Sequence, residues 1–326
     1  MSELLSVKHL NVGFLVKKKK VNVLNDVTFD IGPGEVLGVI GETGCGKSVT
    51  GNAILHLLPD NAVKEGEIIY KGQEILHMPE DKFINLRGEE ISAIPQSPST
   101  SLNPMMKVGN QVAECVTARD KSADKSEVRN RVVEIFDKLH LPRHESLYDN
   151  YPWELSGGMC QRVLIGMGMI THAHLLVIDQ PTKAIDWSLR KSVSEILDEL
   201  KNNMGCSMLM ITHDIPVASY VADRIAVMYC GEIVEIGPTQ EVLHDPIHPY
   251  TQGLVSSMPA NGFKVMRGFM PPFSALPEGC NFCDRCLYAE KDCKQEQSLE
   301  ESRADHFVRC FKCSGQCKEE AYAVGG

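Results

Sequence analysis

The sequence predicts an α/β fold with a parallel central sheet, on three observations. Residues 35–40 and 175–179 are continuous apolar runs of the length expected for buried strands. A glycine-rich loop follows the first run, and an acidic residue ends the second. Amphipathic helical patterns lie between such runs, as in folds that alternate strands and helices. At 326 residues, the chain is long enough for one large domain and a smaller one.

The loop at residues 41–48 carries the clearest chemical signal. Gly41 and Gly46 are separated by four residues and precede Lys47 and Ser48, which is the pattern of a phosphate-binding loop. The glycines let backbone N–H groups face the β- and γ-phosphates of a nucleotide, and the following helix adds its positive dipole end. Lys47 is predicted to reach these phosphates, and the Ser48 hydroxyl to ligate a magnesium ion.

Charge, hydropathy and cysteine content narrow the class of protein. The net charge of −10 argues against a nucleic-acid-binding face, which needs a basic surface. No apolar stretch is long enough to span a bilayer, and the N-terminus lacks the basic flank and apolar core of a secretory signal. We therefore expect a cytoplasmic chain. Of 12 cysteines, seven lie in the last fifty residues, which in a reducing compartment indicates metal binding.

Two segments near the N-terminus, residues 5–14 and 21–31, alternate apolar and polar side chains between turn formers. This pattern predicts an antiparallel β layer ahead of the first buried strand. Phe14 ends the first segment, where an aromatic ring either stacks on adenine or packs in the core. The other elements predicted before residue 95 are a helix at 48–58 and strands at 66–70 and 91–94.

Residues from about 97 to 158 are predicted to form a helical subdomain inserted into the α/β core. Pro95 and Pro98 interrupt regular structure where the insert begins. Residues 108–139 have a helical pattern with one apolar face. That face comprises Val128, Val132, Ile135, Phe136 and Leu139.

The insert ends at a second helix start that suits an anion. Ser156, Gly157 and Gly158 precede an apolar helix at residues 163–170. A serine and two glycines at such a position leave backbone N–H groups available to a phosphate. One chain thus carries two helix ends that favour phosphate.

Two later strands end in polar side chains. Residues 175–179 deliver Asp179, followed by Gln180, and residues 207–212 deliver His213. A parallel strand presents such groups at its C-terminal edge, so Asp179 is expected to face magnesium and His213 the γ-phosphate. The remaining predicted elements are a covering helix at 189–203 and a hairpin of strands at 225–229 and 231–236. Beyond a boundary near Asp245, the composition becomes proline-rich and then cysteine-rich, which divides the chain into domains at 1–245 and 246–326.

Taken together, these motifs resemble the nucleotide-binding subunit of an ATP-binding cassette (ABC) transporter. The resemblance implies a P-loop NTPase core of the ABC type. It equates residues 41–48 with the Walker A loop, Gln96 with the Q-loop glutamine, 155–158 with the signature, 175–179 with Walker B, 184–186 with the D-loop and His213 with the switch histidine. The residues implied to bind ATP are Phe14, Gly41, Thr43, Gly44, Cys45, Gly46, Lys47, Ser48, Val49, Gln96, Ser156, Gly157, Gly158 and Asp186. Those implied to hold Mg²⁺ are Ser48, Gln96 and Asp179, and the catalytic positions are Lys47, Gln180 and His213.

The resemblance also implies partners. Two cassettes meet head to tail, and each ATP lies between the Walker loops of one and the signature of the other. Closure on ATP would then move docked membrane subunits. The implied assembly contains a second, different ABC ATPase subunit, two transmembrane permease subunits and an extracytoplasmic substrate-binding protein, with this chain peripheral at the cytoplasmic face of the cell membrane and no nucleic acid bound.

Residues 97–104 and 248–251 resemble the branch of the family that energises uptake of dipeptides, oligopeptides and nickel. Peptide is the first choice of substrate, and nickel or a metal chelate the second. That branch often carries a C-terminal extension in which four cysteines hold a 4Fe–4S cluster, and the matching positions here are Cys280, Cys286, Cys293 and Cys310.

Other interpretations of the cysteines stay open. Cys283 and Cys286 together with Cys310 and Cys313 have the spacing of a tetrahedral Zn²⁺ site. Cys280, Cys283 and Cys286 could instead begin a ferredoxin-like run. Free thiols are the remaining alternative.

The chain departs from the family pattern at Gln180, where the family has a glutamate that acts as general base. An amide cannot accept that proton at neutral pH, so hydrolysis is expected to be impaired while ATP binding survives. We interpret Gln180 as a substitution engineered to trap ATP, with a naturally weakened site as the alternative. Cys160, Lys183 and Ile185 are smaller departures.

Two other functions compete with a transporter subunit. A soluble ABC protein of DNA repair or translation would need a long coiled-coil insertion or two cassettes in one chain, and neither is present. A regulatory cassette that binds ATP without turning over is supported by Gln180.

Overall fold

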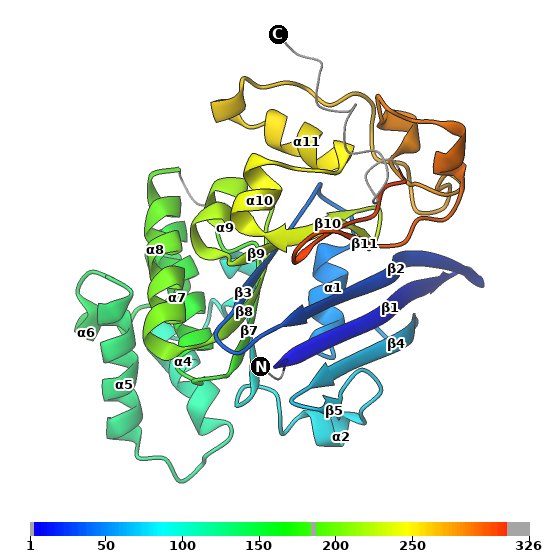
Figure 1. Cartoon of the computed structure of the whole chain (residues 1–326). Helices are drawn as coiled ribbons and strands as arrows, with labels where there is room; N and C mark the ends of the chain where they lie inside the picture. The colour runs from blue at the N-terminus through cyan, green and yellow to red at the C-terminus, as the bar shows by residue number, and fades with distance from the viewer. Residues whose placement is uncertain (1–2, 184–186, 312–326) are drawn as a thin grey trace. The chain divides into compact units, whose positions relative to one another are not determined.

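The computed structural model of the protein describes residues 3–183 and 187–311 (Figure 1). Within this part, the chain forms two compact units. The first unit comprises Ile31–Val36 and the described residues of His77–Val221, and the second comprises Glu3–Asp30, Leu37–Leu76 and the described residues from Ala222 onward. Among the described residues, no helix combines the length and the apolar character that crossing a bilayer requires.

An antiparallel sheet in the second unit is built from the N-terminal strands (Figure 1). These are β1 Leu5–Val16, β2 Lys19–Ile31, β4 Ala62–Tyr70 and β5 Gln73–Glu74. Their order is β2-β1-β4-β5, and β1 pairs with β4 from Leu5 opposite Tyr70 to Phe14 opposite Ala62. This pairing confirms the antiparallel layer that alternating apolar and polar residues predict.

The second unit also pairs strands from distant parts of the chain. These are β3 Val36–Ile40, β9 Arg224–Tyr229, β10 Glu232–Pro238, β11 Glu300–Arg303 and β12 His306–Val308. β3 and β9 are parallel, whereas β9-β10, β10-β12 and β12-β11 are antiparallel. The predicted hairpin is confirmed as β9 and β10. The β11-β12 hairpin was not predicted.

Parallel strands and helices make up the first unit. Its strands are β6 Ile91–Ile94, β7 Leu175–Asp179 and β8 Ser207–Ile211, in the order β8-β7-β6. Its helices are α2 Glu80–Phe83, α3 Pro98–Ser101, α4 Val108–Thr117, α5 Lys125–Lys138, α6 His144–Leu147, α7 Gly157–Met169, α8 Trp187–Met204 and α9 Ile215–Val221. β7 and β8 are buried apolar strands, as expected for parallel strands covered on both faces.

The helical stretch predicted at residues 108–139 consists of two helices, α4 and α5, with a break between them that the apolar pattern did not indicate. Asp120 and Asp124 explain the break, because aspartate side chains compete for backbone N–H groups and favour turns and caps. Asp120 accepts a hydrogen bond from the Ser122 N–H at 2.9 Å. Asp124 caps α5 by accepting from the N–H groups of Ser126 and Glu127. The apolar face predicted for α5 is confirmed, and its side chains are buried.

The helix predicted at residues 48–58 is shorter, with bounds α1 Lys47–Ile54. His56 adopts a left-handed φ of 60°, a conformation that ends right-handed helices. The Leu57 N–H bonds back to the Asn52 carbonyl at 2.8 Å, which closes the last turn. The remaining helical elements of the second unit are α10 Thr239–His244, α11 Pro249–Ser256 and 3₁₀ turns at Pro259–Asn261, Cys283–Arg285 and Lys291–Lys294.

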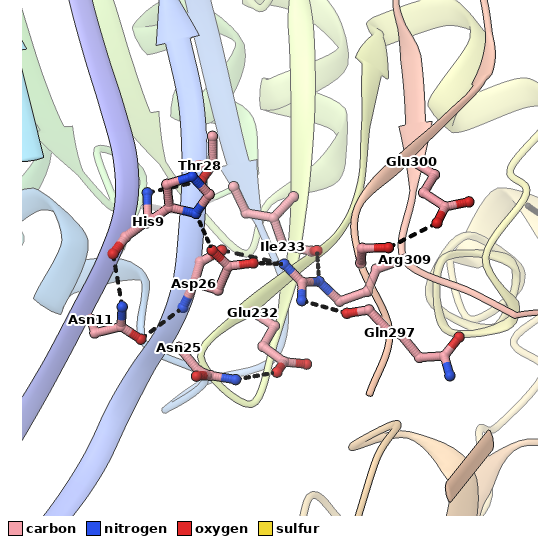
Figure 2. Close-up of polar contacts among 11 residues, drawn as sticks. His9, Asn11, Asn25, Asp26, Thr28, Glu232, Ile233, Gln297, Glu300 and Arg309 are labelled. Carbon is pink, nitrogen blue, oxygen red and sulfur yellow. Dashed lines mark hydrogen bonds and ion pairs between the residues drawn. The ribbon is translucent and has the colours of Figure 1, made fainter. Parts of the chain in front are cut away.

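Arg309 fastens the C-terminal segment of the second unit to its N-terminal strands (Figure 2). The side chain is 6% exposed. Its guanidinium donates to the Ile233 carbonyl at 3.2 Å, to the Gln297 carbonyl at 2.7 Å and to the Asp26 carboxylate at 3.0 Å. Asp26 also pairs with His9 of β1 at 2.7 Å. The buried Arg309 guanidinium therefore joins β2, β10 and the residues around Gln297 to the end of the described chain.

His306 forms a second buried contact of the same segment. Its two ring nitrogens lie 2.8 Å from Glu235 and 3.1 Å from Glu241, and the imidazole is 0% exposed. Burial works to lower the pKa of His306, but hydrogen bonds to both carboxylates outweigh burial, and the pKa lies above its ordinary value. The protonated imidazole therefore stabilises the fold below about pH 6.5, and this contribution is lost as the pH rises through the raised pKa.

We expect His306→Gln to lower the free energy of unfolding by about 1–3 kcal/mol near pH 5.5, because it removes charge-assisted hydrogen bonds. The loss should be smaller at alkaline pH, where the wild-type imidazole is neutral. Urea denaturation of both proteins across this pH range measures it. Equal losses at acid and alkaline pH would contradict a charged His306.

Candidate functional site

The phosphate loop at residues 41–48 has backbone angles that glycine permits. Gly41 has a φ of 151° and Gly46 a φ of 115°. A Cβ added to Gly41 would lie 2.1 Å from the Met228 carbonyl oxygen, so no other residue fits without a backbone shift. Gly46 is the N-cap of α1 and makes no side-chain capping bond. Glycine at the N-cap therefore offers no side-chain acceptor of its own to the first N–H groups of α1, which suits a bound anion.

Lys47 begins α1, and its side chain folds back into the loop. The side chain is 4% exposed. Its ammonium donates to the carbonyl oxygens of Gly41 and Glu42, both at 2.8 Å. The Ser48 side chain is half-buried on the first turn of α1. The sequence predicts Lys47 and Ser48 as phosphate and magnesium contacts, and the loop geometry is compatible with both roles.

Glu42 is a residue of this loop that motif analysis missed. Its carboxylate pairs with the Arg285 guanidinium at 2.9 Å. Its backbone N–H donates to the Tyr250 hydroxyl at 2.9 Å. Burial in the aromatic surroundings raises the pKa of the Tyr250 hydroxyl, which stays neutral. Position 42 is variable in the loop pattern, so no sequence signal marks it.

The first unit brings together the Q-loop glutamine and the residue after Walker B. The Gln96 amide nitrogen donates to the Gln180 side-chain oxygen at 2.7 Å. Gln180 is 8% exposed, has a left-handed φ of 49°, and its N–H donates to the Ile211 carbonyl at 2.7 Å. Asp179, at the end of β7, is half-buried. Amide and carboxylate oxygens, such as those of Gln96 and Asp179, are hard oxygen ligands of the kind that Mg²⁺ takes.

His213 follows β8 and is exposed to solvent. The next residue, Asp214, is 5% exposed and pairs with the Arg190 guanidinium at 2.9 Å. The Thr182 hydroxyl donates to the same carboxylate at 3.2 Å. Asp214 therefore fixes the backbone beside His213 and links it to the segment that follows Gln180.

The signature serine caps a helix and stays accessible. Ser156 is the N-cap of α7, and its hydroxyl accepts a bond from the Met159 N–H at 3.3 Å. Ser156 and Gly157 are exposed, and Gly158 is half-buried. The start of α7 is therefore open to solvent.

The other predicted nucleotide contacts lie as follows. Phe14 is half-buried near the end of β1, and Thr43 and Gly44 are exposed in the loop. Cys45 is 0% exposed, and Val49 lies half-buried in α1. Asp186 falls outside the described residues, as do Cys313 and Cys317 of the cysteine-rich end.

Residues 280–310 of the second unit, which we call the cysteine-rich segment, contain five cysteines. The Cys280 N–H donates to the Cys293 carbonyl at 2.8 Å. Two backbone N–H groups lie 3.4 Å from sulfur, those of Tyr288 on Cys286 and Glu290 on Cys293. Burial, followed by the nearby thiols of Cys310 and Cys293, raises the pKa of Cys280 to about 12. Within residues 3–183 and 187–311, no three His, Cys, Asp or Glu side chains are arranged as a metal site.

Comparison with known families identifies two matches. Residues 24–183 match the family described as "ABC transporter". Residues 234–293 match the family described as "Oligopeptide/dipeptide transporter, C-terminal region". The second match includes Cys280, Cys286 and Cys293.

Curated relatives and solved structures agree with these matches. The oligopeptide transport ATP-binding protein OppD of Bacillus subtilis (strain 168) is 38% identical over 320 residues, covering 95% of this chain and 89% of the relative. OppD of Escherichia coli (strain K12) is 38% identical over 314 residues, covering 95% and 93%. The dimeric ATP-binding cassette MJ0796 bound to ADP and phosphate superposes with a TM-score of 0.65 at 25% identity, covering 72% of this chain and 98% of that one.

The phosphate loop, the paired Gln96 and Gln180 and the capped signature helix thus occur in a chain that aligns with such relatives along nearly its whole length. The chain belongs to the ABC transporter family, among the ATP-binding proteins of oligopeptide and dipeptide transport.

Proposed function

We propose that this chain is the ATP-binding subunit of an importer for di- or oligopeptides. The observation that carries the proposal is the phosphate loop, with Lys47 buried at its centre, in a chain 38% identical to oligopeptide transport ATP-binding proteins over 95% of its length. Its partners are a second, different ABC ATPase subunit, two transmembrane permease subunits and an extracytoplasmic substrate-binding protein. The chain is peripheral and lies at the cytoplasmic face of the membrane.

ATP is bound in a site that two cassettes share. This chain gives Lys47, Ser48, Gln96, Asp179 and His213 to one site, and Ser156, Gly157, Gly158 and Asp186 to contacts across the dimer. The different helix starts support this division, because Gly46 leaves α1 without a side-chain cap whereas Ser156 caps α7 and is exposed. Bound Mg²⁺ supplies charge neutralisation at the β- and γ-phosphates.

Each residue then has a separate task in this site. With ATP bound, the Lys47 ammonium would exchange the loop carbonyls for phosphate oxygens, and Ser48, Gln96 and Asp179 would hold the metal. His213 approaches the γ-phosphate. Gln180 occupies the position of the general base but is already acting as an acceptor from Gln96. Because an amide takes no proton at neutral pH, we propose that this site hydrolyses ATP slowly.

Finer points of organisation belong to the same proposal. Residues 97–158, which contain α3 to α6 and the start of α7, act as an inserted helical subdomain. Residues 1–245 form the nucleotide-binding domain and residues 246–326 a cysteine-rich extension. Phe14, which is half-buried near the end of β1, stacks on adenine.

Purification of the complex from the native membrane tests the proposed function. We expect two permease chains, a second ABC subunit, and ATP hydrolysis stimulated by the peptide-loaded binding protein. A purified chain without membrane partners would contradict the assignment as an importer subunit. Stimulation by a nickel-loaded binding protein but not by a peptide-loaded one would contradict the peptide assignment.

We further propose that Cys280, Cys286, Cys293 and Cys310 hold a 4Fe–4S cluster, with zinc as the alternative. Support comes from the donor set of four thiols and from the N–H groups directed at two of the sulfurs, a type of bond that tunes such clusters. Within residues 3–183 and 187–311, the side chains do not have the arrangement of a metal site, so the cysteine content and not an observed ligand geometry supports this proposal.

Cys286→Ser is expected to lose the bound metal, whereas Cys206→Ser is expected to keep it. Cys206 is 4% exposed in the first unit and donates to the Ala173 carbonyl at 3.1 Å, which is a structural role. Iron, sulfide and zinc analysis of protein purified without oxygen measures the difference. Native protein with neither iron nor zinc would contradict the metal site.

A further inference from the structure

The cysteine-rich segment of the second unit touches the phosphate loop through one side chain. Arg285 lies between Cys283 and Cys286, at the end of the 3₁₀ turn Cys283–Arg285. Its guanidinium is 2.9 Å from the Glu42 carboxylate, and these side chains are 7% and 30% exposed, respectively. The cation therefore reaches from the cysteine-rich segment into the loop that surrounds Lys47.

Several contacts fix Arg285 in this position. Its Nε donates to the Arg267 carbonyl at 2.9 Å, and a second nitrogen lies 3.3 Å from the Tyr229 hydroxyl. The neighbouring Phe282 is 3% exposed and packs edge-on against Tyr229 at a centroid distance of 5.3 Å. The turn that carries Arg285 is thus anchored in the core, so little freedom remains for the guanidinium to leave Glu42.

Glu42 is held at three points, all within the same unit. Its carboxylate pairs with Arg285, its N–H donates to Tyr250, and its carbonyl accepts from the Lys47 ammonium at 2.8 Å. The backbone of Glu42 is therefore part of the wall around the phosphate-binding lysine. Its carboxylate is a negative charge in a loop that must accept the negative phosphates of ATP, and an unpaired carboxylate there would repel them.

We propose that Arg285 is a positioning residue for ATP, through which the cysteine-rich segment sets the nucleotide affinity of the phosphate loop. Arg285 neutralises the Glu42 carboxylate, so the loop presents Lys47 and its backbone N–H groups without a competing negative charge. The inference rests on the proposed function only in that the loop binds ATP.

The test is a set of affinities of the full chain for Mg-ATP, measured by calorimetry or with a fluorescent ATP analogue. Arg285→Gln is expected to weaken binding about tenfold, within the range of roughly 5–150-fold that is typical of coupled sites. Arg285→Lys, which keeps the charge but loses the fork geometry, should weaken it less. Arg303→Gln is the matched control. Arg303 also lies within residues 280–310, but it pairs with Asp245 and not with the phosphate loop, so its loss should leave ATP binding unchanged.

A second substitution separates electrostatic positioning from a general loss of structure. Glu42→Gln removes the negative charge and should bind ATP at least as tightly as the wild type. The double variant Arg285→Gln with Glu42→Gln should recover most of the affinity that Arg285→Gln alone loses. Loss of packing predicts the opposite, since two changes would then weaken binding further than one.

The outcomes distinguish this inference from the function on which it rests. If the wild-type chain and the Arg303→Gln control bind ATP but Arg285→Gln binds equally well, the inference fails and the ATP site stands. If Glu42→Gln weakens binding tenfold or the double variant shows no recovery, Glu42 is not a charge that Arg285 offsets. If the wild-type chain does not bind Mg-ATP at all, the assignment of the phosphate loop fails first.

Discussion

Replacing Lys47 with alanine is expected to weaken ATP binding by roughly 10²–10⁴-fold, which abolishes binding at ordinary nucleotide concentrations. The ammonium is the only side-chain cation that the loop pattern aims at the β- and γ-phosphates. Lys47→Ala removes about two charge-assisted hydrogen bonds, each worth about 1.5–3 kcal/mol. Equilibrium binding of labelled ATP measures the loss.

Lys107→Ala serves as the control for this variant, because the Lys107 ammonium makes an exposed ion pair with Asp149 in the first unit. Exposed pairs of this kind contribute little to stability, so the control should bind ATP as the wild type does. Thermal unfolding of each variant shows whether the fold is retained. Normal ATP affinity in folded Lys47→Ala would contradict the phosphate-loop assignment.

Gln180→Glu is expected to raise ATP turnover at this site by about 10²–10⁴-fold, with little change in ATP affinity. A positioned general base contributes a factor of this size, about 3–5 kcal/mol of barrier. A glutamate at position 180 would keep an existing hydrogen bond, because Gln96 donates at 2.7 Å to the side-chain oxygen that glutamine and glutamate share. The substitution therefore supplies the base without moving its neighbours.

The assay uses an assembled complex whose other ATP site is silenced, since an active partner site would mask the gain. Gln180→Ala is the matched control, because it removes the amide without supplying a base and should show no increase. Equal single-site rates for the wild-type and Gln180→Glu enzymes would place the base elsewhere. That result would favour a regulatory cassette that holds ATP without efficient hydrolysis.

Local patterns predicted much of the fold because their causes are local. The phosphate loop requires glycines at positions of positive φ, and Gly41 and Gly46 have such angles. The apolar run that predicts β7 is a buried strand, and it pairs in parallel with β8. The pairing of Gln96 with Gln180 joins two residues that the motifs had marked separately.

Contacts between distant residues could not be predicted in the same way. Glu42 and Arg285 are 243 positions apart, and no periodicity or spacing relates them. The β11-β12 hairpin escaped prediction because its strands are short and it is stabilised by pairing with β10. Helix ends also depend on caps, which is why the break between α4 and α5 follows from the Asp120 and Asp124 side chains and not from apolar periodicity.

The bond between Arg309 and Asp26 has a consequence for folding during synthesis. These residues are 283 positions apart, and the second unit consists of three chain segments, the last of which begins at Ala222. Most of the first unit, by contrast, is the continuous stretch from His77 to Val221. At about 5–20 residues per second, the ribosome releases Arg309 roughly 15–60 s after Asp26. We therefore expect the first unit to begin folding on the ribosome, and β1, β2 and β4 to pair with one another, before the contact between Arg309 and Asp26 can complete the second unit.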